Sequence, residues 1–285
     1  MITSYQHYEE MCKIAVEQII SKATIQFFRR KGLKVSAEGS GALFSFKDNY
    51  FIVSAAHLLN FESISKLEFI IGGNFGLVSQ LKTKLVVCNS GGKDVQNTDI
   101  SILQINNNLI SEFEKYYSFI SIEHVVPNHN FTSKYFYFLY GYPASKTKII
   151  PHQKKGYIKA CGYWTYPYSS EKYREIKSIE DFKVLFWYDK KRFSNFYSVN
   201  KMHGPDAPGF SGSVMWHIVG NVIRKKEIEK VNVNPVAIMT AFDYPNKMII
   251  GTEFYVVYGL LREAFDLRGL NIKLKKSVSF KYIDS

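Results

Sequence analysis

The feature that most constrains this chain is its succession of short β-prone segments separated by glycine and polar turns. Tyrosine and phenylalanine number 20 and 22 among the 285 residues, and aromatic side chains favour strands over helices. An apolar content of 46% supplies a full hydrophobic core and excludes disorder as the main state. We therefore expect an all-β fold, with strands in segments that include 24–28, 50–57, 67–71, 83–88, 133–142, 184–188 and 235–243.

Helical patterns occur near the two ends of the sequence. Residues 5–22 carry apolar side chains at roughly helical spacing and predict an amphipathic helix packed on the fold. Residues 254–265 run from a strand into a helix, and 269–285 form a basic tail. There is no apolar run of membrane-spanning length, and the acidic residues near the N-terminus argue against a cleaved signal.

The cysteines indicate the compartment. Cys12, Cys88 and Cys161 are odd in number, widely spaced and without a histidine at metal-ligand spacing. This pattern argues against a disulfide framework and against a zinc site, and it favours a reducing environment. We therefore expect a cytoplasmic protein.

The net charge of +12 leaves the nature of the partner open. Basic residues fall in short, dispersed clusters, and residues 221–234 read as a basic, hydrophilic loop. A nucleic acid or an acidic membrane would fit a single basic stripe. Dispersed clusters fit better with the solvated loops of a basic protein, so nucleic acid is not the favoured partner and no membrane is expected.

A serine-centred turn stands out at residues 204–214. Gly209-Phe210-Ser211-Gly212-Ser213 reads G-x-S-G-S and is followed by an apolar run. Glycines around a serine indicate a tightly folded backbone, which leaves the hydroxyl and nearby N–H groups pointing into one space. Ordinary turn chemistry is the alternative. A catalytic interpretation therefore requires a base and a group that orients it elsewhere in the chain.

Candidates for both roles lie at strand ends. His57 closes the strand 50–57 after a run of small residues, and Asp99 stands at the head of the strand 98–105. A buried structural histidine and a surface aspartate are the alternatives. Asp94 competes with Asp99, but no apolar strand follows it in register.

Four segments in this order resemble the chymotrypsin-like, or trypsin-like, serine protease family, in particular its bacterial intracellular members. The resemblance covers roughly residues 24–267. The four matching segments are Gly39-Ser40-Gly41-Ala42-Leu43, Ser54-Ala55-Ala56-His57, Asp99-Ile100-Ser101-Ile102-Leu103 and Gly209-Phe210-Ser211-Gly212-Ser213. The second is similar to the T/S-A-A-H box, the third to the D-I/L-A-x-L box and the fourth to the G-D/N-S-G-G/S box.

The resemblance implies two six-stranded antiparallel barrels with an N-terminal and a C-terminal helix. The expected divisions are 1–22 for the first helix, 23–130 and 131–255 for the barrels, and 256–285 for the last helix and tail. Segment 144–200 is longer than a minimal member needs and is a candidate specificity or docking loop.

The resemblance also implies the roles of individual residues. Ser211 would be the nucleophile, His57 its general base and Asp99 the group that orients the base. The N–H groups of Gly209 and Ser211 would form the oxyanion hole. Neither a metal nor an organic cofactor is implied.

The same resemblance outlines a pocket for the substrate side chain. Its lining would comprise Pro205, Asp206, Ala207, Thr240, Ala241 and Phe242. Asp206 lies next to the position where trypsin carries its acid, which favours cleavage after basic residues. A turn role for Asp206 beside Pro205 is the stronger alternative.

Departures from the family pattern bear on activation. There is no Ile-Val-Gly-Gly-like segment before the first strand, and Phe210 replaces the aspartate that pairs with a freed N-terminus. We expect a serine endopeptidase switched by other means, such as a protein partner in bacterial stress or antiviral defence. The alternative is a dormant protease-fold module that uses its basic surface to bind a protein or a nucleic acid.

Overall fold

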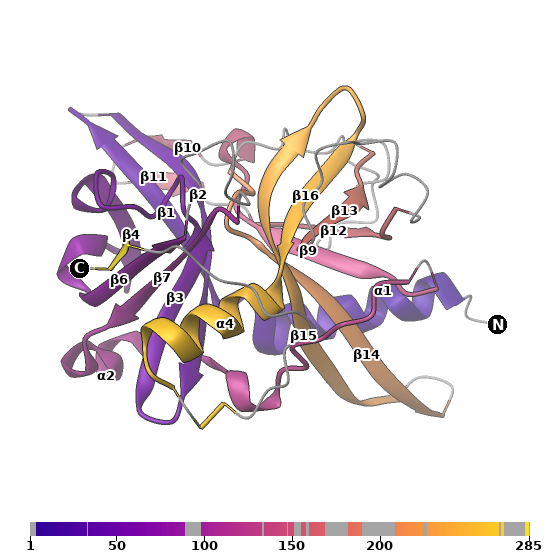
Figure 1. The fold of residues 1–285 in the computed structure, drawn as a ribbon. Coiled ribbons are helices and arrows are strands. Elements are labelled where there is room, and N and C mark those ends of the chain that lie inside the picture. Colours follow the sequence, from indigo (N-terminus) through magenta and orange to yellow (C-terminus); the bar gives the residue numbers. More distant parts are fainter. Residues whose placement is uncertain are drawn as a thin grey trace.

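Two large β-sheets dominate the computed structural model (Figure 1). Apart from the C-terminal strand β17, which joins the first sheet, the strands of the second sheet follow those of the first in the chain, and the few helices lie around them (Figure 1). The expected all-β double-barrel class is confirmed. The structure describes residues 4–32, 34–88, 98–132, 134–146, 148–150, 155–157, 160–168, 182–189, 209–224, 227–267, 269–270 and 283–284.

The first sheet has nine strands among the described residues, in the order β17-β6-β7-β3-β2-β1-β4-β5 with β8 beside β2. β8 pairs with β2 in parallel. The strands are β1 (Thr24–Lys31), β2 (Lys34–Phe46), β3 (Asn49–Ala55), β4 (Leu67–Ile71), β5 (Asn74–Leu77), β6 (Lys82–Cys88), β7 (Ile100–Ile105), β8 (Ile120–Ser121) and β17 (Ile283–Asp284).

The second sheet has six strands in the order β12-β9-β14-β15-β16-β13, all joined by antiparallel pairs. They are β9 (Tyr137–Gly141), β12 (Cys161–Thr165), β13 (Lys183–Trp187), β14 (Val214–Arg224), β15 (Glu227–Asp243) and β16 (Met248–Glu253). A separate two-stranded ribbon joins β10 (Lys148–Ile150) to β11 (Lys155–Tyr157).

The expectation of a hydrophilic loop at 221–234 is wrong. β14 and β15 continue through this segment as a long hairpin, with Gly220 opposite Val231 and Val222 opposite Ile228 (Figure 1). In the second arm, Val231 and Val233 alternate with Asn232 and Asn234, as in a strand with one polar face. The cross-strand pairing therefore prevails over the hydrophilic composition.

Helices cover the sheets where the sequence pattern places them. The N-terminal segment forms α1 (Ser4–Ala15) and continues as a π-helical turn η1 (Val16–Ile20). The second long helix, α4 (Phe254–Ala264), follows β16 directly. Shorter elements are α2 (Ile110–Phe113) and the 3₁₀ turns η2 (Ile64–Lys66), η3 (Val78–Gln80), η4 (Asn107–Leu109), η5 (Ile122–His124) and η6 (Ala144–Lys146).

Strand alternation divides the hydrophobic core into three clusters. On β3, Ile52 faces the interior of the first barrel, whereas Phe51 and Val53 face a cluster shared by both sheets. On β14, Met215 faces the interior of the second barrel and Trp216 faces the shared cluster. Successive side chains of a strand point to opposite faces, so each sheet is covered on both sides. The shared cluster also takes in buried residues of α1 and α4, and it fixes the two sheets against each other.

The described helices include none that is both long and apolar enough to cross a membrane. All three cysteines are free, with Cys12 and Cys88 buried and Cys161 half-buried.

Two histidines meet at one end of the second barrel. The rings of His129 and His217 lie 4.7 Å apart between centroids, and His129 Nε2 lies 2.8 Å from the Tyr137 hydroxyl. Burial lowers the pKa of His217 from its ordinary value of 6.5. The folded chain therefore binds a proton at His217 less readily than the unfolded chain does.

We expect the free energy of unfolding to fall as the pH drops through about 6.5, because protonation of His217 favours the unfolded state. A His217→Phe variant keeps the ring packing and removes the titrating group, so it should lose less stability on acidification. Urea unfolding at a series of pH values measures the difference. His124→Gln, at an exposed position, is the control and should follow the wild type.

Candidate active site

The Gly-x-Ser-Gly-Ser segment forms a tight turn immediately before β14. Gly209 and Gly212 have φ angles of +97° and +78°, a region that residues with a side chain rarely adopt. A Cβ at Gly212 would lie 2.0 Å from the Ser40 carbonyl oxygen, and one at Gly209 would lie 2.2 Å from the Ala144 nitrogen. Only glycine therefore fits at these two positions, because the backbone has a positive φ and neighbouring backbone atoms leave no room for a Cβ.

Neighbouring residues anchor the turn to the second barrel. Phe210 is fully buried and belongs to the hydrophobic cluster inside that barrel. The Gly212 N–H donates to the Met239 carbonyl at 2.8 Å, and the Ser213 N–H donates to the Phe210 carbonyl at 2.9 Å. Phe210 is thus an apolar anchor of the serine turn.

Ser40, on β2, attaches the same turn to the first sheet. Its N–H donates to the Ser211 carbonyl at 2.9 Å, and its hydroxyl donates to the Gly209 carbonyl at 3.3 Å. Ser40 is fully buried. Gly39 permits this approach, because a Cβ there would lie 2.9 Å from the Ser211 carbonyl oxygen. The Gly39-Ser40 pair therefore joins the two sheets at the serine turn.

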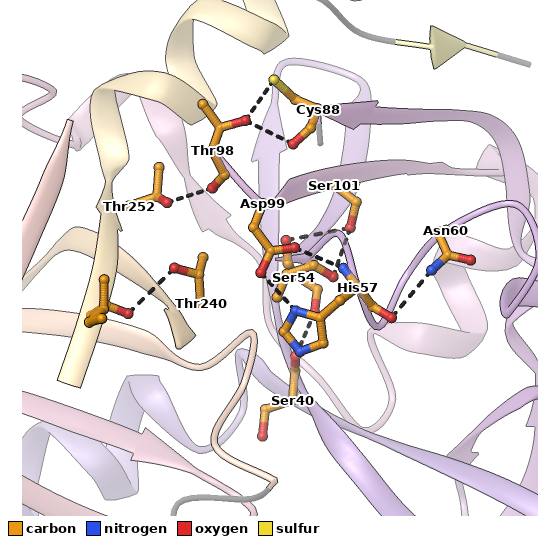
Figure 2. A network of polar contacts seen from close by, with 12 residues as sticks. Ser40, Ser54, His57, Asn60, Cys88, Thr98, Asp99, Ser101, Thr240 and Thr252 are labelled. Carbon is orange, nitrogen blue, oxygen red and sulfur yellow. Dashed lines mark hydrogen bonds and ion pairs between the residues drawn. The ribbon is translucent and has the colours of Figure 1, made fainter. Parts of the chain in front are cut away.

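His57 and Asp99 are in direct contact (Figure 2). His57 Nδ1 lies 2.7 Å from Asp99 Oδ2, and the His57 backbone N–H donates to Asp99 Oδ1 at 2.9 Å. The Asp99 side chain is 12% exposed, whereas the His57 side chain is 43% exposed. A carboxylate accepting at Nδ1 places the ring proton there, which leaves Nε2 as the nitrogen able to accept a proton.

Asp99 itself has an uncommon backbone conformation, with φ of +47° just before β7. Aspartate tolerates this left-handed region better than most residues, but it needs support from its neighbours. The Asp99 carbonyl accepts the Ala56 N–H at 3.0 Å, so the strand end that carries His57 also holds Asp99. The competing candidate, Asp94, lies outside the described residues.

Ser211 and His57 come from different sheets but lie against the same strand end. A Cβ at Gly212 would lie 2.2 Å from Ser54 Oγ and 3.2 Å from the Ala55 nitrogen, at the end of β3 just before His57. Within the described part of the chain, no hydrogen bond joins Ser211 Oγ to the His57 ring. The histidine and aspartate are thus engaged with each other, and the serine lies near them without being engaged.

The serine turn also carries two backbone donors of interest, the N–H groups of Gly209 and Ser211. Among the described residues, neither the Gly209 N–H nor the Ser211 N–H donates to a backbone acceptor. Unpaired N–H groups on a glycine turn are the groups that form an oxyanion hole, which was the role expected of these two residues.

The expected pocket is described on one side. Thr240 is 5% exposed, and its hydroxyl contacts Lys183 Nζ at 3.2 Å. Ala241 is exposed, and the Phe242 ring packs against Tyr188 and Tyr244. Pro205, Asp206 and Ala207 lie outside the described residues, and the expected preference for basic side chains stays a prediction.

Sequence reasoning missed several residues that support the site. The Ser54 hydroxyl donates to the Ser40 carbonyl at 2.8 Å, and the Ser101 hydroxyl donates to the carbonyl of Ser54 at 3.4 Å. Both serines stood within matched segments, so their proximity to the candidate residues was a usable signal. Lys183 is the first residue of β13, and nothing around it in the sequence indicates its contacts.

A comparison with solved structures agrees with this architecture. The chain is similar in structure to mouse neuropsin, a serine protease expressed in the limbic system of the brain, with a TM-score of 0.51. The two share 12% sequence identity over 86% of this chain and 95% of the other. No protein-family model and no curated protein matches the sequence. At this identity the likeness establishes the fold, which is the chymotrypsin-like double barrel.

We expect Gly212→Ala to destabilise the fold strongly. Gly32 is the matched control, because its φ of +58° imposes similar strain while a Cβ there meets nothing within 4 Å. Both substitutions should lose about 1 kcal/mol to left-handed backbone strain. Gly212→Ala should lower the free energy of unfolding by about 1–3 kcal/mol more, because its methyl group collides with Ser40 and Ser54. Urea unfolding measures both, and equal losses would contradict the close approach.

Proposed function

We propose that the protein is a serine endopeptidase that cleaves peptide bonds through an acyl-enzyme on Ser211. The observation that carries the proposal is the paired contact of Asp99 with the ring and the backbone of His57, beside a glycine turn that presents Ser211. The chymotrypsin-like fold supports the same conclusion.

In the proposed reaction, Ser211 Oγ attacks the carbonyl carbon of the substrate while His57 Nε2 takes the hydroxyl proton. His57 then gives this proton to the leaving amine, and the acyl group remains on Ser211. A water molecule releases the acyl group by the same steps in reverse order. Asp99 stays ionised, holds the proton on Nδ1 and stabilises the imidazolium that forms.

The N–H groups of Gly209 and Ser211 would bind the negative charge that develops on the substrate carbonyl oxygen. Each donor in such a hole contributes about 3 kcal/mol of transition-state stabilisation. The positive φ of Gly209 and its contact with Ala144 fix the turn in advance, so little reorganisation is needed during the reaction.

Activation by a protein partner forms part of the proposal. The buried Phe210 ring cannot accept an ion pair from a freed N-terminus, which argues for another switch. The unengaged Ser211 Oγ also fits a site that is completed when a partner or a substrate binds, because catalytic hydrogen bonds are often long before substrate binding. A partner acting in bacterial stress or antiviral defence, in the cytoplasm, remains the expected context.

A second candidate function is supported by the same unengaged serine. A dormant protease-fold module would keep the histidine–aspartate pair for stability and would bind a protein or a nucleic acid through its basic surface. Covalent labelling distinguishes the two, since a dormant module does not react at Ser211 under any activating condition.

We expect the wild-type protein to react covalently with a fluorophosphonate probe, with the label on Ser211. Ser211→Ala should abolish labelling. Ser213→Ala is the matched control within the same turn, because Ser213 Oγ is buried without a hydrogen-bond partner in the described structure. That variant should label normally. Intact-mass and peptide-mapping spectra give the result, and label on any other serine contradicts the proposal.

We expect Asp99→Asn to lower the labelling rate constant about 10³- to 10⁴-fold, because asparagine favours the wrong ring tautomer. The fold should persist, since an amide oxygen can still accept the His57 backbone N–H. Circular dichroism checks the fold, and stopped-flow or gel-based labelling measures the rate. A variant that reacts as fast as the wild type would remove Asp99 from the mechanism.

A further inference from the structure

A polar cluster joins the two sheets behind Asp99 (Figure 2). At its centre is the carbonyl of Thr98, the residue before Asp99. The Thr252 hydroxyl donates to this carbonyl at 2.5 Å, and Lys183 Nζ donates to it at 3.4 Å. Lys183 also contacts the hydroxyls of Thr252 at 2.8 Å and Thr240 at 3.2 Å. Two strands of the second sheet, β13 and β16, therefore donate to the carbonyl that leads into Asp99, and β15 contributes Thr240 as a partner of Lys183.

The first sheet holds the same residue from the other side. The Thr98 hydroxyl donates to the Cys88 carbonyl at 2.8 Å and lies 2.9 Å from Cys88 Sγ. Thr98 is 3% exposed. Its side chain is thus fixed by the first sheet, and its carbonyl is fixed by the second.

Lys183 brings a positive charge into this contact. Lys183 is half-buried, and its ammonium group lies among hydroxyl and carbonyl oxygens of both sheets. Burial raises the pKa of the Cys88 thiol in the first sheet, and the Thr98 hydrogen bond and, to a smaller extent, the Lys183 charge act against that rise. A charged group in a partly desolvated place is costly unless it is hydrogen-bonded. Hydrogen bonds to a charged group are stronger than those between neutral groups, so the contacts of Lys183 hold their acceptors firmly.

The geometry of the peptide bond links this cluster to the carboxylate. The peptide group between Thr98 and Asp99 is planar, so fixing the Thr98 carbonyl also fixes the direction of the Asp99 N–H. One further rotation, φ, then sets where the Asp99 side chain points. This is the angle that has the uncommon value of +47°. A clamp on the carbonyl therefore opposes relaxation of Asp99 out of the left-handed region.

We propose that Lys183 is a positioning residue of the active site: with Thr252 it clamps the Thr98 carbonyl, and this clamp fixes the Asp99 carboxylate that orients His57. The inference rests on the proposed function, which it deepens. Lys183 touches neither the substrate nor Ser211 in this role; it acts through Asp99. The clamp also makes the positions of Thr98 and Asp99 depend on β13 and β16 of the second sheet.

The test compares Lys183→Met, which keeps the length and removes the charge, with Lys183→Arg, which keeps the charge. Lys84→Met is the matched control, because Lys84 Nζ is a part-buried ammonium that donates to the Ala264 carbonyl at 2.6 Å, away from Thr98. Three measurements are made on the full chain. They are the rate constant for fluorophosphonate labelling of Ser211, the proton resonance of His57 Nδ1–H, and stability in urea.

We expect Lys183→Met to slow labelling about tenfold or more and to shift or broaden the His57 Nδ1–H resonance. Lys183→Arg should recover the rate to within about threefold of the wild type, since it restores the charge and a donor. With a cleavable peptide, the loss in Lys183→Met should fall on kcat and leave KM unchanged. Lys84→Met should lose stability without changing the resonance or the rate.

A milder pair of variants covers the case in which Lys183→Met does not fold. Thr252→Val removes one donor to the Thr98 carbonyl, and Thr252→Ser retains it. Thr252→Val should move the His57 resonance in the same direction as Lys183→Met, and Thr252→Ser should not.

The proposal is overturned if Lys183→Met, or Thr252→Val where the former is unfolded, leaves the His57 resonance in place and the rate within about twofold. It is also overturned if Lys84→Met slows labelling as much, which would make the effect one of general stability. Failure of the wild type to label would refute the proposed peptidase instead. The resonance would then still decide whether Lys183 positions Asp99 and His57.

Discussion

The structure depends on one place where the backbones of the two sheets touch. Ser40 on β2 hydrogen-bonds both carbonyls that flank Phe210, and Gly39 and Gly212 supply the room for this approach. Side chains at either glycine would push the sheets apart by more than a packed core tolerates. The shared hydrophobic cluster presses the sheets together, but it is this contact that sets where Ser211 lies relative to the strand end of His57.

A second contact, on the other side of Asp99, makes the junction rigid. Thr98 is held by Cys88 in the first sheet and by Thr252 and Lys183 in the second. The histidine–aspartate pair thus lies between two bridges that each span both sheets. A small rotation of one sheet against the other would alter both bridges at once.

Sequence reasoning found what is local. The boxes around His57, Asp99 and Ser211 lie within a few residues of each strand end, so a single segment carries each signal. The strand pattern likewise predicted β3, β7 and the second half of β15. The hairpin at 221–234 was missed, because its charges indicated a loop. Each arm is stabilised by pairing with the other arm, which the composition of the segment does not reveal.

What could not be predicted is what depends on distant partners. Lys183 and Thr98 are 85 positions apart, and no pattern near either residue indicates their contact. The left-handed conformation of Asp99 is likewise set by neighbours on other strands. The position of Ser211 relative to His57 depends on how the two sheets meet at Ser40, which periodicity does not encode.

The burial of Phe210 has a consequence for how the serine turn responds to its surroundings. An aspartate at this position would hold the turn by charge, and its grip would weaken as salt screens the pair or as acid protonates it. An aromatic ring in the barrel interior is indifferent to both. Its attraction to the core instead weakens on cooling, as apolar burial does near ordinary temperatures. The serine turn is thereby decoupled from ionic strength and tied to temperature.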